Sequence, residues 1–516
     1  MLRWSTAAWG AIAATSLFLL ITCWFVIEDR SIPIFDAGLH LQLALEVHRE
    51  LAAGHLTKAL TVSVPYPPFP YLVESLGLAI GGIGVAQPIL AENFVFIPLL
   101  ALGCYHVGRL TFGATAGFLA VVFAFGSPLI ISMFHVVMID GPEATMVAVS
   151  LWAILASERF SRIGVSALAG LCVGLGMLTK EPAAFFVAGP LVVALLRGGW
   201  RRWRGLLAFA VVALAVSLPW YISELSLVNG IASGALTSPS SAGLPADIAP
   251  HPLSLDNFEW YAWNLINAQL YMPLFAFAAI GWIWTIIGFL RQRWVSPLAP
   301  EITIGAFVGW LGITETFAHD TRYSMPLLVY LAVFGAGWVI HLPRRWSWGL
   351  GAALVTVAVV NTVGIIFEVG EDIRLKLPGA QAEFRQNPGF ITVSHTGGFL
   401  SGRPARDGDL LTTLRALKFE GVRTVVVESR TLFEPDFSEA GISALSAIAG
   451  LKAEVWEGGP QTRLTTQDAI LLHRPIGPNW RHPCITLSDG TGVWIVIGDP
   501  QSKDSSYDCP ATEESA

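Results

Sequence analysis

Residues 7–27 read AAWGAIAATSLFLLITCWFVI, and residues 35–40, a few positions later, read FDAGLH. The first stretch holds no charged side chain and is long enough to cross the hydrocarbon core of a bilayer as a helix. The second stretch places the carboxylate of Asp36 just beyond that span and opens a segment with an amphipathic pattern. The sequence therefore predicts a membrane protein that carries an acidic group where the bilayer meets water.

The composition of the whole chain fits this prediction. Hydrophobic residues make up 53% of the 516 residues and charged residues only 13%, and the mean hydropathy is +0.59. Soluble domains carry about 25% charged residues. The 19 Trp and 29 Phe suit many interfacial and lipid-facing positions. The net charge of -7 is mild and gives no reason to expect nucleic acid as a partner.

Further apolar segments predict about eleven membrane-spanning helices. They lie near residues 7–27, 88–108, 114–133, 142–157, 163–179, 182–197, 205–221, 268–290, 302–317, 323–341 and 347–367. Residues 71–84 are apolar but short and rich in Gly, so we expect them to dip into the interface. The first span has a basic start but no clear Ala-x-Ala site, so we expect an uncleaved helix rather than a signal peptide.

The basic residues predict the orientation of these spans. Cytoplasmic loops of membrane proteins carry an excess of Lys and Arg. With the N-terminus in the cytoplasm, twelve basic residues fall on the inner side and five on the outer side before residue 368. The inner ones are Arg3, Arg109, Arg159, Arg162, Arg197, Arg201, Arg202, Arg204, Arg291, Arg293, Arg344 and Arg345, and the outer ones are Arg30, Arg49, Lys58, Lys180 and Arg322. The outer loops would then be residues 28–87, 134–142, 222–267 and 318–322.

From about residue 368 onward the chain changes character. Charge rises, long apolar runs stop, and short strand-like segments alternate with amphipathic helical ones. Strands are expected near 390–394, 423–428, 469–473 and 493–497, and helices near 409–420 and 437–451. The fold class predicted is thus a polytopic α-helical membrane protein (residues 1–367) with a C-terminal extracytoplasmic α/β domain (residues 368–516).

The cysteines agree with an outer location for the C-terminal part. Cys23, Cys104 and Cys172 fall inside apolar spans and are expected to be plain apolar side chains. Cys484 and Cys509 are the two cysteines after residue 367, and an oxidising compartment would allow a disulfide between them. The alternative, two free thiols in a reducing compartment, would overturn the topology. No Cys or His spacing is typical of a zinc site.

Polar residues gather at the outer ends of the predicted spans. Because charges in membrane segments are costly, they usually have a function. Four loops or turns on the outer side could together build one site. They hold Asp36, His40, Glu46 and Tyr66; His135 and Asp140; Lys180 and Glu181; and His319, Asp320, Arg322 and Tyr323.

Each of these residues also has an ordinary structural interpretation. Asp36 and His40 are four apart and would share a helix face, as a base and its neighbour; alternatively Asp36 caps the helix and His40 is solvated. Asp140 precedes a Gly-Pro pair and could cap its helix. Lys180 and Arg322 suit anion binding, with Arg able to grip a phosphate with two donors. Alternatively they extend toward lipid headgroups.

Several short motifs follow one another along the first two thirds of the chain. They read FDAGLH at 35–40, YPPFPY at 66–71, MID at 138–140, GLGMLTK at 174–180, PWY at 219–221 and RYSMP at 322–326. In this order they resemble the polyprenyl-phosphate-dependent glycosyltransferases of the membrane-embedded C-type superfamily, in the branch of protein O-mannosyltransferases and lipid A aminoarabinose transferases. The resemblance covers roughly residues 1–345.

The chain also departs from that family's pattern. Ala37 stands where the family usually has Glu after the first Asp, and His40 stands where it has Tyr. Tyr66 replaces a Lys or His before the Pro pair, and Glu181 replaces the Gly after Lys180. The missing Glu leaves a divalent metal a possibility without a defined ligand set, so no metal ligand and no certain cofactor is assigned.

The resemblance implies a catalytic role for Asp36 and Asp140 and donor-phosphate binding by Arg322 and Lys180. His40, Tyr66, His135, His319 and Tyr323 would line the substrate site. The expected partners are a polyprenyl-phosphate sugar donor, a lipid, glycan or protein acceptor, and membrane lipids. The expected location is a bacterial-type cytoplasmic membrane.

Two other functions are compatible with the sequence. A lipid or solute transporter would explain the spans, but its charges would lie near the midplane and no inverted repeat is visible. A non-catalytic scaffold with a binding domain would leave the charged cluster unexplained.

Overall fold

A computed structural model describes the chain from the first helix to the last strand. The residues it describes are 5–29, 31, 33, 35–63, 65–226, 229–230, 233, 251–291, 296–316, 319–370, 373–376, 389–394, 408–419, 421–428, 439–458, 468–472, 484–486 and 492–497.

Residues up to 367 are mostly helical, as the apolar segments predict. In chain order the elements are α1 (Thr6–Glu28), α2 (Phe35–Ala52), α3 (Leu56–Ala59), α4 (Phe69–Gly81), α5 (Ala86–Phe112), α6 (Ala114–Phe125), α7 (Pro128–Met133), α8 (Asp140–Ala156), α9 (Ile163–Met177), α10 (Ala183–Leu196), η1 (Gly199–Arg201), α11 (Trp203–Ser223), α13 (Leu255–Asn264), η3 (Leu265–Leu270), α14 (Tyr271–Leu290), α15 (Ala299–Thr314), η4 (Thr321–Ser324), α16 (Leu327–Ile340) and α17 (Arg344–Phe367).

Five helical segments among the described residues are long and apolar enough to cross a bilayer. They are α1, α5, α11, the continuous run Leu255–Leu290 and α17. Further apolar helices of 10–17 residues lie between them, among them α6, α9, α10, α15 and α16. The chain is therefore a multi-pass membrane protein, whereas the expected total of eleven spans stays a prediction.

The expected span at 114–133 is two helices rather than one. α6 ends at Phe125 and α7 begins at Pro128, with Ser127 in an extended conformation between them. Proline explains the break, because it disfavours helical geometry in the preceding residue and is well suited to the first turn of a new helix. Pro326 similarly separates the short turn η4 from α16.

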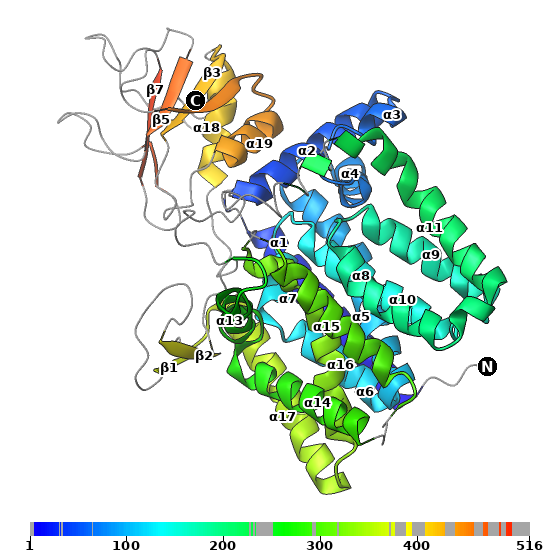
Figure 1. Cartoon of the computed structure of the whole chain (residues 1–516). Helices are drawn as coiled ribbons and strands as arrows, with labels where there is room; N and C mark the ends of the chain where they lie inside the picture. Colours follow the sequence, from blue (N-terminus) through cyan, green and yellow to red (C-terminus); the bar gives the residue numbers. More distant parts are fainter. Residues whose placement is uncertain are drawn as a thin grey trace.

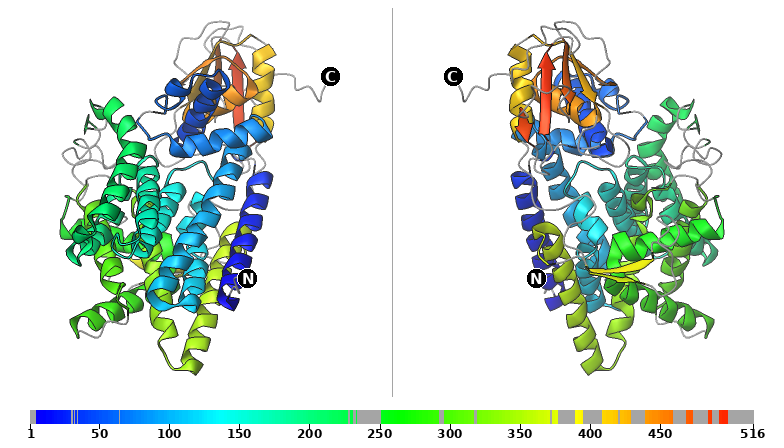
Figure 2. Two further views of the ribbon diagram at one scale, coloured as in Figure 1. Left: turned by 90° about the vertical axis from the view of Figure 1, so that its right-hand side faces the viewer. Right: turned by 90° about the vertical axis from the view of Figure 1, so that its left-hand side faces the viewer.

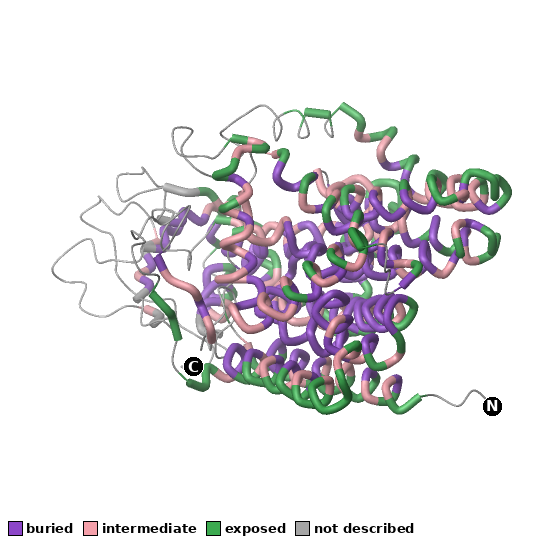
Figure 3. The backbone as a smooth tube through the Cα atoms, turned by 60° about the horizontal axis from the view of Figure 1, so that its bottom comes forward, coloured by how far each residue is buried: buried purple, intermediate pink, exposed green. Residues whose placement is uncertain are grey.

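The most buried helices lie in the middle of the bundle. α16 buries every residue from Leu327 to Gly337, and α8 is buried over most of its length. A helix that is apolar on all sides belongs in the interior of a bundle. Figure 3 shows this pattern, with buried segments in the centre and exposed ones around the edge. α8 carries Asp140 at its first residue, so a central element of the bundle positions that side chain.

The C-terminal part contains the strands and helices expected from the sequence. They are β1 (Ile373–Lys376), β2 (Phe390–Ser394), α18 (Gly408–Phe419), β3 (Thr424–Glu428), α19 (Glu439–Ala449), β4 (Glu454–Gly458), β5 (Asp468–Leu472), β6 (Ile485–Thr486) and β7 (Gly492–Ile497). A five-stranded sheet has the order β4-β3-β5-β7-β6, with β4, β3 and β5 parallel and β7 antiparallel to both of its neighbours. β2 lies apart, paired with β1.

The five-stranded sheet and its helices sit at one end of the helical bundle. Figures 1 and 2 show the sheet beside α2, with α19 between the strands and that helix. α18 and α19 share an apolar core with the sheet, formed by residues such as Leu414, Leu445, Val425 and Leu471. α19 therefore has one face on the sheet and another available for α2.

Cys484 is disulfide-bonded, while Cys23, Cys104 and Cys172 are free. Cys509 lies outside the described residues, so its expected pairing with Cys484 stays a prediction.

Candidate active site

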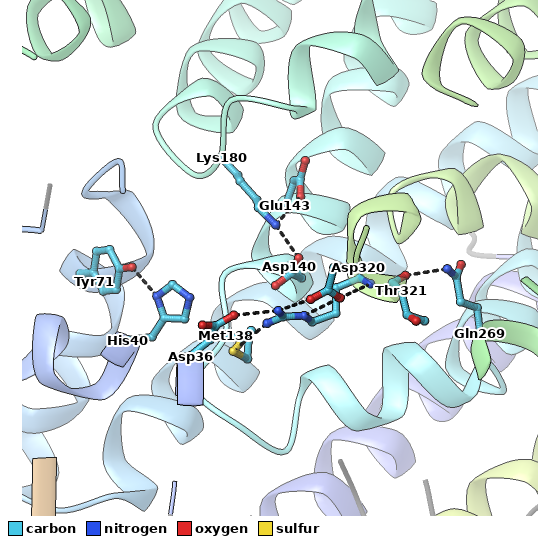
Figure 4. A network of polar contacts seen from close by, with 11 residues as sticks. Asp36, His40, Tyr71, Met138, Asp140, Glu143, Lys180, Gln269, Asp320 and Thr321 are labelled. Carbon is cyan, nitrogen blue, oxygen red and sulfur yellow. Dashed lines mark hydrogen bonds and ion pairs between the residues drawn. The ribbon is translucent and has the colours of Figure 1, made fainter. Parts of the chain in front are cut away.

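Arg322 and Asp36 meet at one end of the bundle, although 286 positions separate them in the sequence. The Nη2 atom of Arg322 donates to Oδ2 of Asp36 over 2.7 Å. The Asp36 side chain is 46% exposed, whereas that of Arg322 is 16% exposed. Figure 4 shows Asp36 at the start of α2. Asp36 thus has one charged partner and an open side from which a substrate can approach.

Asp320 holds the other edge of Arg322. Its Oδ1 accepts from Nε of Arg322 over 2.9 Å and from the Arg322 backbone N–H over 2.8 Å, and its Oδ2 accepts from Nη2. A carboxylate that binds both the backbone and the guanidinium fixes the direction of the arginine. One further atom near the guanidinium is the sulfur of Met138, 3.6 Å from Nη1.

The turn that carries Arg322 is anchored from a neighbouring segment. Nε2 of Gln269 donates to the carbonyl of Thr321 and to Oγ of Ser324, both over 2.6 Å. The Thr321 hydroxyl donates to Asn264 over 2.8 Å. A short 3-10 turn has few hydrogen bonds of its own, so these side-chain contacts keep Arg322 in place.

Lys180 and Asp140 form a second ion pair, deeper in the protein. The Nζ–Oδ1 distance is 2.6 Å, and the two side chains are 10% and 2% exposed. Glu143, one turn further along α8, lies 3.7 Å from the same Nζ. The ammonium also lies over the ring of Tyr323, 4.7 Å from its centre. This pair joins the first turn of α8 to the turn between α9 and α10.

His40 lies on the same helix as Asp36 but is buried. Its Nδ1 is 2.6 Å from the hydroxyl of Tyr71, and its ring is in edge contact with Tyr66. Burial lowers the pKa of His40 from 6.5 to about 4, although Asp140 and Asp36 act to raise it. His40 is therefore neutral near pH 7, and it links α2 to α4.

The neighbouring carboxylates change the pKa values of Arg322 and Lys180. Burial would by itself lower the pKa of Arg322, but Asp320, Asp140 and Asp36 together raise it above its ordinary value. Burial would likewise lower the pKa of Lys180, and the carboxylates of Asp140 and Glu143 raise it instead. Both cations consequently stay charged across the physiological pH range.

Two expected lining residues have different surroundings. His135 is 1% exposed and its ring stacks on that of Phe25 in α1, with the centres 3.9 Å apart. Nε2 of His319 is 2.6 Å from Oδ1 of Asn257 in α13. Their substrate-lining role stays a prediction.

Three of the charged residues take part in the two ion pairs. Asp36 lies within the first turn of α2, at its second residue, and bonds to Arg322 rather than capping the helix. Asp140 is the first residue of α8, and its carboxylate accepts a hydrogen bond from Lys180. Lys180 is directed inward to Asp140 rather than toward lipid headgroups. His40 is 2% exposed, which does not fit the alternative of a solvated side chain.

Sequence reasoning underrated three residues. The sequence does not indicate that Asp320 holds Arg322, and it assigns no role to Glu143 or Tyr71. Glu143 follows Asp140 by three residues on a helix, a spacing that places both carboxylates on one face. That spacing is a usable signal in the sequence, whereas the contact between Tyr71 and His40 is visible only in the fold.

The residues present do not define a metal centre. Within the part of the chain that the structure describes, no three His, Cys, Asp or Glu side chains lie close enough together to hold a metal ion. Ala37 stands beside Asp36 and has no ligand atom to offer. We therefore derive no chemical step through a metal.

The chain is similar to known proteins in part of its sequence and in its fold. The family described as dolichyl-phosphate-mannose-protein mannosyltransferase matches residues 65–222. No curated protein matches the chain. ArnT from Cupriavidus metallidurans bound to undecaprenyl phosphate resembles the chain with a TM-score of 0.53 at 18% identity, over 70% of this chain and 65% of that one. The apo form of that ArnT gives a TM-score of 0.50 at 20% identity, over 68% and 63%.

These matches cover only part of the proteins that are compared. The family match covers less than half of the chain, and the chain spans slightly less than two thirds of the ArnT structures. At these identities the structural likeness concerns the fold. The resemblance expected from the motifs is confirmed: this chain is similar to the polyprenyl-phosphate-dependent membrane glycosyltransferases of the C-type superfamily.

Proposed function

We propose that this protein is an inverting glycosyltransferase that moves a sugar from a polyprenyl-phosphate donor to an acceptor on the outer face of a bacterial-type cytoplasmic membrane. The observation that carries the proposal is the 2.7 Å contact between Asp36, half exposed, and Arg322. It would bring a general base next to a cation suited to phosphate binding. The resemblance to ArnT, whose structure holds undecaprenyl phosphate, supports this kind of donor.

Arg322 is the donor-phosphate residue in this proposal. Its guanidinium offers planar, paired donors that match the oxygens of a phosphate. The departing phosphate gains charge as its bond to the sugar breaks, and a fixed cation stabilises that charge. Asp320 keeps the guanidinium oriented while the substrate binds.

Donor binding would change the partner of Arg322. Because the Nη2 atom of Arg322 is occupied by Asp36, a phosphate at that position competes with the carboxylate. Release costs Asp36 little, since its side chain is already 46% exposed and water replaces the lost contact. The freed carboxylate is then available to the acceptor.

Asp36 is the general base. It takes the proton from an acceptor hydroxyl or amine while that oxygen or nitrogen forms a bond to the anomeric carbon. The bond between the anomeric carbon and the phosphate oxygen breaks, and polyprenyl phosphate leaves with the electron pair. A single displacement of this kind inverts the anomeric centre. Phosphate leaves readily without protonation, so the mechanism requires no general acid.

Lys180 and Asp140 support the site rather than exchange partners. Their buried pair holds the first turn of α8 against the turn before α10. Lys180 adds positive charge near Tyr323, the residue after Arg322, so it contributes to the field that the phosphate meets. Asp140 would orient Lys180 and, through it, this side of the site.

The orientation follows from the distribution of basic residues. With the N-terminus in the cytoplasm and residues 368–516 outside, twelve of them fall on the inner side and five on the outer side, which supports this orientation. Residues 1–367 would form the transferase domain, and the C-terminal domain would help to select a lipid, glycan or protein acceptor. The transferred group would be a hexosyl or pentosyl unit.

A transfer assay tests the proposal. The purified protein would be reconstituted with polyprenyl phosphate carrying radiolabelled mannose and, in a second series, a radiolabelled pentose. Transfer to an acceptor or slow hydrolysis with inverted configuration supports the enzyme. Movement of the intact donor across the bilayer would instead identify a transporter, and binding without either would identify a scaffold; both results would contradict the proposal.

A further inference from the structure

Helix α19 of the C-terminal part lies directly against α2, the helix that begins at Phe35. The two backbones come close together at Gly38, where a Cβ atom would lie 2.5 Å from the backbone nitrogen of Gly441 and 2.8 Å from the carbonyl carbon of Ala440. Real Cβ atoms do not approach backbone atoms this closely. The two helices can touch here only because position 38 has no side chain.

A directed hydrogen bond fixes the register of this contact. Nε2 of Gln42 donates to the carbonyl of Ala440 over 3.0 Å. Gln42 lies one helical turn after Gly38, so the hydrogen bond and the backbone contact fall on the same side of α2. The contact is therefore specific in both distance and orientation.

The same helix shares an apolar core with the loop that precedes α8. Ala444 of α19 is fully buried in a cluster with Leu41 of α2 and with Val137 and Ile139. Val137 and Ile139 flank Met138, whose sulfur contacts Arg322. α19 thus packs on α2 and belongs to the same apolar cluster as the loop that carries Met138.

Helix geometry relates this contact to Asp36. Successive residues of an α-helix are rotated by about 100°, so positions 36 and 38 point to nearly opposite sides of α2. Asp36 points to Arg322 and Gly38 points to α19. α2 therefore lies between Arg322 and α19, so a displacement of α2 by α19 would also move the carboxylate of Asp36.

We propose that α19 positions the general base, and that Gly38, Gly441 and Gln42 are positioning residues for Asp36. This inference rests on the proposed function. α19 connects strands β3 and β4, so the placement of the C-terminal sheet sets the distance between Asp36 and its substrates. A misplacement of about 1 Å can lower a rate by about a hundredfold.

Gly38→Ala is the main test. Alanine is the better helix former, so any loss must come from the contact with Gly441 rather than from α2 itself. We expect kcat for sugar transfer to fall by at least about tenfold, with the KM for the donor within about twofold of wild type. Gly349→Ala is the matched control, because a Cβ at this helical glycine meets nothing within 4 Å.

A pair of variants at Gln42 tests the same contact without a steric clash. Gln42→Glu removes the donor and sets a carboxylate against the Ala440 carbonyl, whereas Gln42→Lys keeps a donor. The first should lower kcat by about threefold with KM unchanged, and the second should restore most of it. This pair decides the proposal if Gly38→Ala does not fold.

Hydrogen exchange gives a readout that does not depend on the reaction. In Gly38→Ala the amides of α2 should exchange faster, while those of α9, distant from the contact, should not change. If the wild-type protein transfers no sugar, the proposed function has failed, and the exchange of α2 still reports on the contact.

Three results would overturn the inference. The first is an unchanged kcat in Gly38→Ala, whether or not α2 exchanges faster. The second is a parallel rise in KM, which would indicate a general structural role. The third is an equal loss of kcat in Gln42→Glu and Gln42→Lys.

Discussion

Two ion pairs of the same chemical kind occupy very different surroundings. In the pair between Arg322 and Asp36, the side chains are 16% and 46% exposed, whereas in the pair between Lys180 and Asp140 they are 10% and 2% exposed. An exposed pair contributes little to stability and can exchange a partner, whereas breaking a buried pair leaves an uncompensated charge. We therefore expect the pair of Arg322 and Asp36 to take part in the reaction, and the pair of Lys180 and Asp140 to stabilise the fold around it.

The largest effect should come from Asp36→Asn. The amide has the shape of the carboxylate but cannot accept the acceptor's proton, so kcat should fall by about three orders of magnitude. The radiolabelled transfer assay measures it, with thermal unfolding as a control for folding. Near-wild-type turnover in a folded Asp36→Asn variant would remove Asp36 as the base and with it the contrast between the two pairs.

The next effect should come from Arg322→Lys. A lysine keeps the charge but loses the paired donors that grip both Asp320 and a phosphate, so transfer should fall by about a hundredfold. Lys180→Arg is the matched exchange at the other pair and should affect the folding yield more than kcat. Equal losses of kcat in the two variants would show that the pairs do not differ in role.

Asp140→Asn should reduce stability rather than only activity. It leaves the ammonium of Lys180 buried with Glu143 at 3.7 Å as the remaining carboxylate, and breaking such a pair costs about 3–5 kcal/mol. Thermal unfolding in detergent would measure this loss. The double variant Asp140→Asn with Lys180→Met should recover most of the stability, and no recovery would contradict a charge-pair origin.

The smallest effect concerns pH. Burial lowers the pKa of His40 from 6.5 to about 4, so the unfolded chain binds a proton more readily than the folded one between these values. The stabilisation is complete above pH 6.5 and is lost as the pH falls toward 4, by up to about 3 kcal/mol.

His40→Gln should therefore flatten the fall of thermal stability between pH 6.5 and pH 4. Unfolding temperatures measured at intervals across that range would show it. An equally steep fall in wild type and in His40→Gln would mean that other groups carry the acid sensitivity.

The sequence predicts which residues belong to this site better than it predicts which of them contact one another. Asp36, Asp140, Lys180 and Arg322 are recognisable because each is a charge at the end of an apolar segment. The pairing of Asp36 with Arg322 is not recognisable, since 286 positions separate them and nothing in either segment specifies the other.

For the fold as well, the sequence predicts the individual elements better than the contacts between them. Apolar length predicts the helices, and the break at Ser127 has a local cause in Pro128. The packing of α19 on α2 has no local signal, because α19 has the ordinary pattern of an amphipathic helix and Gly38 has the ordinary appearance of a flexible residue. The need for glycine at position 38 becomes clear from its backbone contact with Gly441, which leaves no room for a Cβ atom.

The most direct test of the central claim is a structure of this protein with bound polyprenyl phosphate. We expect the phosphate at the guanidinium of Arg322, with Asp36 released from Nη2 and facing the acceptor side, while Lys180 remains paired with Asp140. A phosphate bound at Lys180, with Asp36 still held by Arg322, would contradict the account.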